Sequence, residues 1–269
     1  MNLRISLATV LLSFRTTAHA AAFVVSRPTA TTTTTPLETT TTTTTALKAT
    51  SGSLGCRPIG IGSAHPSTII TNDDLSQVVD TSDEWIRTRT GIAKRRVLTQ
   101  GESIQHLGTQ AAKMALDMSG LDPQDIDLII CATSSPQDLF GDATSIAADL
   151  ECTNVVAFDL MAACSGFLFG IVTAGHYLEG PTGSVKNALV IGADALSRWV
   201  DWDDRNSCIL FGDGAGAMVL TADPDSPGVL SSSTHSNGKG YCDLNLRYVD
   251  IMIYLCICIY MHFIGLSKI

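Results

Sequence analysis

The chain is short of basic residues, and its cysteines follow no pattern. Its 269 residues include 17 lysines and arginines against 26 aspartates and glutamates, which gives a net charge of −9. A protein with this charge balance does not attract nucleic acid as a whole, so we predict no nucleic-acid partner. None of the eight cysteines forms a C-x-x-C pair or a Cys/His cluster with the spacing of zinc ligands. The sequence therefore predicts no metal site.

The spacing of the cysteines also does not indicate a disulfide framework. Cys56, Cys131, Cys152, Cys208 and Cys242 stand far apart in the sequence and share no regular spacing. Small secreted domains hold their cysteines in patterned pairs, whereas most intracellular proteins keep them reduced. We expect these five cysteines to be free thiols in a reducing compartment.

No dinucleotide-binding fingerprint is present, although one run is rich in glycine. Gly212, Gly214 and Gly216 come before or at the start of the apolar segment 215–222, whereas the fingerprint follows a strand and opens a helix. A nucleotide site at this run is the minor alternative. We favour a tight turn at which the backbone packs closely against its neighbours.

The first 53 residues have the composition of targeting segments and are set apart from the fold. Arg4, the apolar stretch 5–14 and the small residues at 18–20 indicate a signal peptide over residues 1–20. Residues 21–53 are rich in threonine, and we expect them to be disordered. Two interpretations stay open: a two-part algal presequence that leads to the plastid (chloroplast stroma), and the O-glycosylated stalk of a secreted protein. The unpatterned thiols favour the plastid.

The last residues, 248–269, do not continue the pattern before them. Ile251 to Leu266 is an apolar run of 16 residues, which is slightly short for a membrane-spanning helix. A C-terminal membrane anchor is one interpretation. The other, which we favour, is that this tail is translated noncoding sequence such as an unspliced intron.

Between these ends, residues 54–247 alternate apolar strands with amphipathic helices. Hydrophobic spacing and capping residues predict each element. Strands are expected at 57–64, 92–98, 127–132, 155–158, 187–191 and 215–222, and helices at 73–80, 81–89, 103–119, 144–150 and 164–179. Strands that are apolar throughout are buried on both faces, so the sequence predicts a layered α/β domain whose sheet is covered on both sides.

Three local features lie in the segment 71–98. Asn72 is expected to cap the helix 73–80. The sequence TSDE at 81–84 matches a capping box for the next helix, which Gly91 ends. The basic residues Lys94 to Arg96 are expected on a solvated strand edge rather than in an interaction patch.

Cys164 lies where an extended segment meets a helix. Val155 to Phe158 precede it, and apolar residues at helical spacing follow it. At a helix N-terminus the unpaired backbone N–H groups and the helix dipole stabilise a thiolate and lower the pKa of the thiol. The small residues around Cys164 would admit a substrate carbonyl. Position alone leaves two interpretations open, a nucleophile and a buried cysteine that acts as a small hydrophobe.

Five motifs together resemble one family. They are TNDDL (71–75), VDTSDEWIRTRTGIAKRRV (79–97), AFDLMAACSGF (157–167), ALVIGAD (188–194) and FGDGAGAMVL (211–220). The family is the β-ketoacyl-acyl-carrier-protein synthase III enzymes of the thiolase superfamily, which start type II fatty acid synthesis. The resemblance runs from Leu54 to Asn237. It implies the N-terminal half of the thiolase-like α/β/α/β/α fold, with the C-terminal half absent from this chain.

The resemblance also implies a role for each of six residues. Cys164 would accept the acyl group of acetyl-CoA, and malonyl-acyl carrier protein would then condense with the thioester to give a 3-oxoacyl product. Trp85 and Arg205 would hold the two faces of the CoA adenine, with Thr81 and Arg89 at further positions of the CoA site. Phe140 falls where the family's aromatic residue reaches the acyl pocket of a partner subunit, which implies a homodimer. No cofactor is implied, because acyl-CoA is a substrate.

The departure from the family is at the C-terminus. The family's catalytic histidine and asparagine stabilise the carbanion formed when a malonyl group loses carbon dioxide, and neither has a counterpart in this sequence. His235 matches a surface turn and takes no catalytic role. We therefore expect this chain alone to be poorly soluble and unable to condense malonyl substrates. Two alternatives stay open: a relative that acts on other CoA thioesters, of the polyketide starter or hydroxymethylglutaryl-CoA synthase type, and a non-enzymatic secreted or tail-anchored protein with a threonine-rich stalk.

Overall fold

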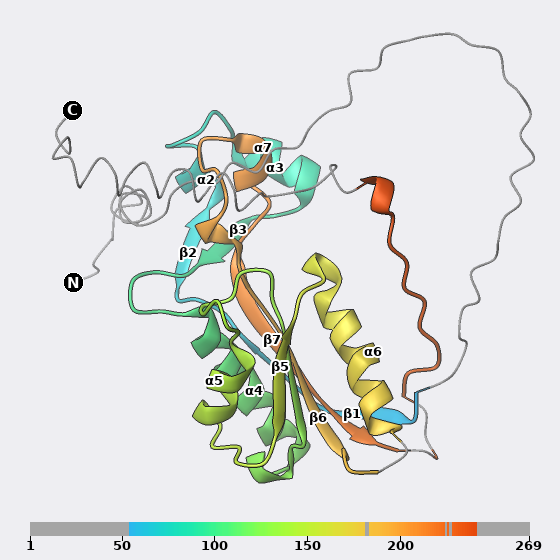
Figure 1. Cartoon of the computed structure of the whole chain (residues 1–269). Helices are drawn as coiled ribbons and strands as arrows, with labels where there is room; N and C mark the ends of the chain where they lie inside the picture. Colours follow the sequence, from blue (N-terminus) through green and yellow to red (C-terminus); the bar gives the residue numbers. More distant parts are fainter. Residues whose placement is uncertain (1–53, 181–182, 224, 226–227, 241–269) are drawn as a thin grey trace, which may run out of the picture.

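The structure is a computed structural model that describes residues 54–180, 183–223, 225 and 228–240 (Figure 1). The expectations for residues 1–20, 21–53 and 248–269 concern segments outside this range. Within the described residues, no helix is long and apolar enough to cross a membrane.

Five strands form one mixed sheet in the order β1-β7-β6-β4-β5. Their bounds are Cys56–Ala64 (β1), Leu128–Ala132 (β4), Val156–Leu160 (β5), Asn187–Ala195 (β6) and Asp213–Ala222 (β7). Strand β4 pairs in parallel with β5 on one side and β6 on the other, whereas β7 runs antiparallel to both β6 and β1. The last residues of β4, β5 and β6 therefore lie along one edge of the sheet, which we call the carboxyl edge.

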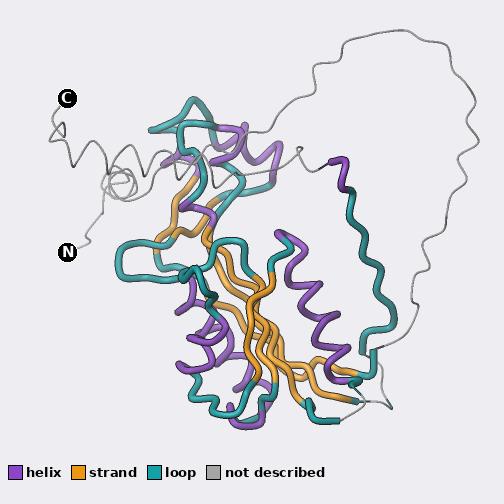
Figure 2. The backbone as a smooth tube through the Cα atoms, viewed as in Figure 1, coloured by secondary structure: helices purple, strands orange, loops and turns teal. Residues whose placement is uncertain are grey.

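Helices cover the sheet on both faces, as Figure 2 shows. Helices α4 (Ile104–Ser119) and α5 (Ala143–Asp149) pack on one face, and α6 (Gly166–Leu178) packs on the other. All five residues of β4 are buried, because this strand lies between two layers of side chains. The predicted layered α/β domain is confirmed, together with its five main strands and these three helices.

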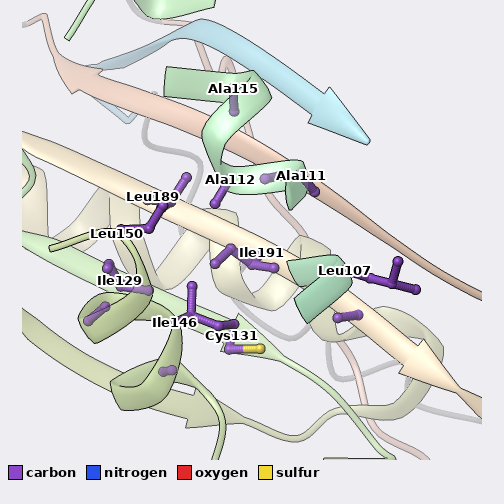
Figure 3. Close-up of a cluster of buried hydrophobic side chains, with 14 of the residues drawn as sticks. Leu107, Ala111, Ala112, Ala115, Ile129, Cys131, Ile146, Leu150, Leu189 and Ile191 are labelled. Carbon is purple, nitrogen blue, oxygen red and sulfur yellow. The ribbon is translucent and has the colours of Figure 1, made fainter. Parts of the chain in front are cut away.

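The larger core lies between the sheet and the helices α4 and α5 (Figure 3). Leu107 and Ala111 of α4, Ile146 of α5, and Leu189 and Ile191 of β6 all belong to it, and none is more than 4% exposed. The burial of such apolar side chains is the dominant favourable term in folding. A second core, between the sheet and α6, includes Leu128, Ile130, Ala174 and Val190.

Two glycines allow α4 to pack directly on the backbone of β1. A Cβ atom added at Gly60 would lie 2.1 Å from the carbonyl oxygen of Ala115. One added at Gly62 would lie 2.1 Å from the carbonyl oxygen of Ala111. Only a residue without a side chain permits this approach.

Two methionines of α4 engage the outer edge of β1. Met118 Sδ accepts the N–H of Ile61 at 3.3 Å, and Met114 Sδ accepts the N–H of Ser63 at 3.4 Å. Unpaired backbone N–H groups on an edge strand offer a template for pairing with another chain. Two of these donors in β1 are therefore already occupied.

A small lobe stands at the carboxyl edge of the sheet, at the top of Figure 1. It consists of β2 (Thr68–Thr71), α2 (Asn72–Leu75), α3 (Asp83–Thr90), β3 (Lys94–Val97) and α7 (Arg205–Cys208). Strands β2 and β3 pair antiparallel. A separate core holds the lobe together, made by Ile70, Leu75, Ile86, Val97, Val200, Cys208 and Ile209. The sequence did not predict β2 or α7, because four-residue elements carry too little periodicity.

Two expectations about the helices of the small lobe are wrong. The helix expected at 73–80 ends at Leu75, and its N-cap is Thr71 rather than Asn72. Helix α3 is capped by Ser82, one residue after the expected Thr81, and ends at Gly91 as predicted. Asn72 is instead almost fully buried, at 1% exposure, and its side chain binds other segments of the lobe.

Two further expectations are corrected by burial and strand bounds. Lys94 is exposed and Arg96 is half-buried, but Arg95 is only 5% exposed, so the basic run does not lie on a solvated edge. Gly214 and Gly216 lie within strand β7 rather than in a turn. The expected close packing is found at Gly212, where a Cβ would lie 3.0 Å from the carbonyl oxygen of Arg96.

Acid should loosen the small lobe before the central sheet. The Thr71 hydroxyl holds the pKa of Asp74 below its ordinary value, and Arg87 and Asn72 do the same for the pKa of Asp83. Such carboxylates contribute stability that is present above their unfolded pKa and lost as the pH falls through their folded pKa. Burial raises the pKa of Asp213 in β7, so its contribution has the opposite sign and grows in acid.

Hydrogen exchange followed by mass spectrometry measures this difference, between about pH 7 and about pH 3 and corrected for intrinsic exchange rates. We expect protection of residues 71–90 to fall at a higher pH than protection of residues 187–195 and 213–222. Loss of protection in both regions at the same pH would contradict the expectation.

Candidate functional site

Cys164 lies at a strand-to-helix junction, as the sequence predicts. Strand β5 ends at Leu160, a 3-10 turn spans Ala163–Ser165, and α6 begins at Gly166. Cys164 is exposed, whereas Cys56, Cys131 and Cys208 are buried. The alternative that Cys164 is a buried small hydrophobe is therefore wrong.

The residue before Cys164 holds a strained backbone conformation. Ala163 has φ 47°, in the left-handed region, which costs an L-residue other than glycine about 1–2 kcal/mol. On the other side of Cys164, Gly166 packs against β4, since a Cβ there would lie 3.2 Å from the Cβ of Ala132. Strain of this kind gathers at functional sites, where the surrounding structure holds it. The sequence carries no signal for it, because alanine does not favour positive φ.

Burial sets Cys131 and Cys208 apart from Cys164. Burial raises the pKa of the Cys131 thiol well above its ordinary value, and nearby carboxylates add to the effect. Burial also raises the pKa of Cys208 to about 11, although Arg95 opposes the shift. The thiolate is the nucleophilic form of cysteine, so burial disfavours the reactive form of Cys131 and Cys208.

Trp85 of α3 lies against two guanidinium groups. The Cζ atom of Arg89 is 4.3 Å from the centroid of the Trp85 ring, and the Cζ atom of Arg205 is 4.6 Å from it. Arg205 also donates to the backbone carbonyl of Asp80 at 2.9 Å. Cation–π attraction of this kind stabilises a guanidinium over an indole face. We call Trp85, Arg89 and Arg205 the tryptophan clamp.

The tryptophan clamp is assembled from two distant segments of the chain. Trp85 and Arg89 lie on α3. The backbone N–H of Trp85 donates to the hydroxyl of Ser82, the N-cap residue of this helix, at 3.1 Å. Arg205 opens α7, which Asp204 caps. Thr81 directly precedes the cap of α3, and its hydroxyl is buried without a hydrogen-bond partner among the described residues. A buried hydroxyl without a partner is costly for folding.

Phe140 projects from the loop before α5. It is 95% exposed, and Leu139 beside it is 87% exposed. The carboxylate of Asp159 in β5 accepts the N–H groups of Asp142 at 2.9 Å and of Ala143 at 2.7 Å. These bonds tie the Phe140 loop to the strand that leads into Cys164.

The Cys164 turn and the tryptophan clamp share the carboxyl edge of the sheet. Strand β5 leads from this edge into the turn, and β6 leads from it toward Arg205 and α7. Figure 1 shows the small lobe at the same end of the sheet as the start of α6. Ligands of open α/β sheets bind beyond the carboxyl ends of the strands, so both groups lie at the end of the sheet where a ligand would be expected.

The described residues hold other polar features that involve none of the predicted site residues. A cavity of about 470 Å³ at the N-terminal end of α4 is lined by residues that include His65, Arg96, Glu102 and His106. None of the predicted site residues lines it. His235 is exposed, with Nε2 2.8 Å from the hydroxyl of Ser233. No group of histidine, cysteine, aspartate and glutamate side chains in the described segments has the arrangement of a metal site.

Comparison with known protein families identifies one match. Residues 158–238 match the model of the family described as 3-oxoacyl-[acyl-carrier-protein (ACP)] synthase III. A β-ketoacyl-[acyl-carrier-protein] synthase III of Synechococcus sp. (strain WH7803) is 58% identical over 197 residues, which are 73% of this chain and 58% of that protein. A chloroplastic synthase III of Arabidopsis thaliana is 53% identical over 193 residues, which are 71% of this chain and 47% of that protein. The chain thus spans about half the length of these curated relatives.

Solved structures give the same fold. The crystal structure of a 3-oxoacyl-[acyl-carrier-protein] synthase III from Aquifex aeolicus VF5 superposes with a TM-score of 0.61 at 43% identity, over 73% of this chain and 66% of that one. A priming β-ketosynthase from the R1128 polyketide pathway superposes with a TM-score of 0.60 at 35% identity, over 63% of this chain and 50% of that one. The predicted thiolase-like fold is confirmed over the matched part. The matches favour a condensing enzyme over a non-enzymatic stalked protein.

Proposed function

The chain belongs to the β-ketoacyl-[acyl-carrier-protein] synthase III family, and from that membership we propose that it carries the acyl-accepting site of a condensing enzyme. In this proposal Cys164 takes the acyl group of acetyl-CoA, or of another short acyl-CoA, at the start of type II fatty acid synthesis. The observation that carries it is the exposed Cys164 on a strained turn, at the same sheet edge as the tryptophan clamp.

The proposed step at Cys164 is a thioester exchange. The Cys164 thiolate attacks the acyl carbonyl carbon, the bond from that carbon to the CoA sulfur breaks, and CoA leaves as a thiolate that takes up a proton. The N-terminal end of α6, a helix of 13 residues, favours negative charge on the attacking sulfur and on the carbonyl oxygen. No cofactor is needed, because one thioester replaces another.

The second step would form the carbon–carbon bond. Malonyl-acyl carrier protein loses carbon dioxide, and the resulting carbanion attacks the thioester on Cys164 and releases the cysteine as a thiolate. Among the described residues, Cys164 provides the nucleophile for these two reaction steps. The proposal for the described residues therefore concerns the first step, the transfer of the acyl group to Cys164.

The tryptophan clamp is the proposed binding place for the nucleotide part of CoA. Because Arg205 Cζ lies 4.6 Å from the centroid of the Trp85 ring, the Arg205 side chain would have to move off the ring for adenine to stack between them. An indole ring and a guanidinium plane both stack on flat aromatic groups such as adenine. Arg89 and Arg205 also supply positive charge for the phosphates.

Acetyl-CoA should acylate Cys164 and no other described cysteine. Incubation of the chain with acetyl-CoA, followed by peptide mapping in the mass spectrometer, should place an acetyl group on the peptide that contains Cys164. Cys164→Ala should abolish the label, because the nucleophile is removed. Cys152→Ala, a half-buried thiol elsewhere in the fold, is the matched control and should label like the unchanged chain.

Iodoacetamide separates a wrong function from a misfolded sample. A folded chain should react with it at Cys164 faster than at the buried Cys131 and Cys208. Alkylation at Cys164 without any acetylation by acetyl-CoA would refute the proposed function.

We also propose that the enzyme acts as a homodimer in which Phe140 reaches the partner subunit. The 95% exposure of Phe140 supports an apolar contact outside the chain. In sedimentation velocity the unchanged chain should be dimeric, and Phe140→Asp should weaken the dimer by at least about tenfold, because a buried charge is introduced. Leu230→Asp changes another exposed apolar residue and should leave the dimer intact. A monomeric unchanged chain would contradict the proposal.

We further propose that the protein works in a plastid. Its relatives include cyanobacterial proteins and a chloroplastic one. A fluorescent protein fused after residues 1–55 should enter the plastid of an algal host, whereas residues 21–55 alone should stay in the cytosol because the signal peptide is missing. Fluorescence in the medium would contradict plastid targeting and favour the secreted alternative.

A further inference from the structure

Arg95 is a buried charge that forms no ion pair with a carboxylate of the described residues. It is 5% exposed, and its guanidinium donates to three oxygen atoms. Nη1 donates to the carbonyl of Ile70 at 3.4 Å, while Nη2 donates to Asn72 Oδ1 at 2.9 Å and to the carbonyl of Ile209 at 3.1 Å. Nε is buried without a partner among the described residues. Burial of a charge in this way is costly for folding.

Asn72 extends the same network to α3. Its side chain is 1% exposed and donates to Asp83 Oδ1 at 2.8 Å and to the carbonyl of Ile92 at 2.8 Å. Asp83 is the first residue of α3 and stands two positions before Trp85. Ile209 directly follows α7 and stands four positions after Arg205. The pair Arg95 and Asn72 therefore links the two helices that carry the tryptophan clamp.

We propose that Arg95 and Asn72 are positioning residues for the nucleotide part of CoA. They hold α3 and α7 at the separation at which Trp85 and Arg205 face each other. The inference rests on the proposed function, because it assigns a task to residues that lie behind the CoA site and do not touch the ligand. It also gives a reason for a buried charge that is costly for folding.

Arg96 is an arginine on the same strand that does not link α3 to α7. It is half-buried, and its Nη1 donates to the carbonyl of Pro66 at 2.7 Å. Pro66 lies in the connection between β1 and β2, so this contact does not join α3 to α7. Arg96 is therefore a matched control for Arg95.

The test compares Arg95→Lys with Arg96→Lys in the full chain, with adenosine 3′,5′-bisphosphate as the probe. Lysine keeps the positive charge but lacks the planar fork that binds several oxygens at once. Calorimetric titration should show that Arg95→Lys raises the Kd by about tenfold, because the clamp is misplaced. Arg96→Lys should change the Kd by less than about twofold. Equal Kd values for Arg95→Lys and the unchanged chain would overturn the proposal.

A double-mutant cycle separates positioning from a purely structural role. In a chain that already carries Arg205→Ala, Arg95→Lys should cause no further loss of affinity, because the clamp it positions is gone. Additive losses in the cycle would overturn the proposal. A purely structural Arg95 would lower the thermal unfolding midpoint and leave the affinity of the folded protein unchanged.

If the Arg95→Lys variant does not fold, Asp83→Ala tests the same network at its other end. Asp83 is half-buried and accepts from both Asn72 and Arg87. Arg87→Ala removes only the second of these contacts and is its matched control. We expect Asp83→Ala to weaken nucleotide binding more than Arg87→Ala does, and equal effects would overturn the proposal. An unchanged chain that does not bind the probe would refute the proposed function itself, whatever the variants do.

Discussion

The parallel pairing of β4 with β5 and β6 is the constraint on which the functional edge depends. Ala132 at the end of β4 stands opposite Leu160 on one side and Gly192 on the other. Because all three strands run in the same direction, the chain leaves β5 and β6 at the same edge, once into the Cys164 turn and once toward α7. Every residue of β4 is buried, so its register depends on how its side chains fit into the two close-packed layers.

Most of the fold was predictable because its main elements are long and periodic. Helix α4, expected at 103–119, spans Ile104–Ser119, and its apolar residues recur at helical spacing. The family resemblance predicted the residues of the tryptophan clamp, whereas hydrophobic periodicity did not. Their contact depends on helix α7, which has four residues and leaves too short a pattern to be recognised.

Two decisive features could not be read from the sequence. The solvated-edge interpretation of Arg95 failed because its burial depends on Ile209, 114 residues further along the chain. A local charge pattern carries no information about such a partner. The positive φ of Ala163 was equally hidden, because the residue type that signals this conformation is glycine. In both places the local preference of the residue is overridden by its tertiary surroundings, which is typical of functional sites.

The methionine sulfurs on β1 bear on how the molecule can assemble. At the start of β1 the carbonyl of Cys56 accepts the N–H of Gly228 at 2.9 Å, and further on Met118 and Met114 accept the N–H groups of Ile61 and Ser63. Strand β5 is the outermost strand on the opposite side of the sheet. A sheet with one occupied border can join a second copy through the remaining one only. Growth by strand addition then stops at a closed pair, so this geometry disfavours fibres.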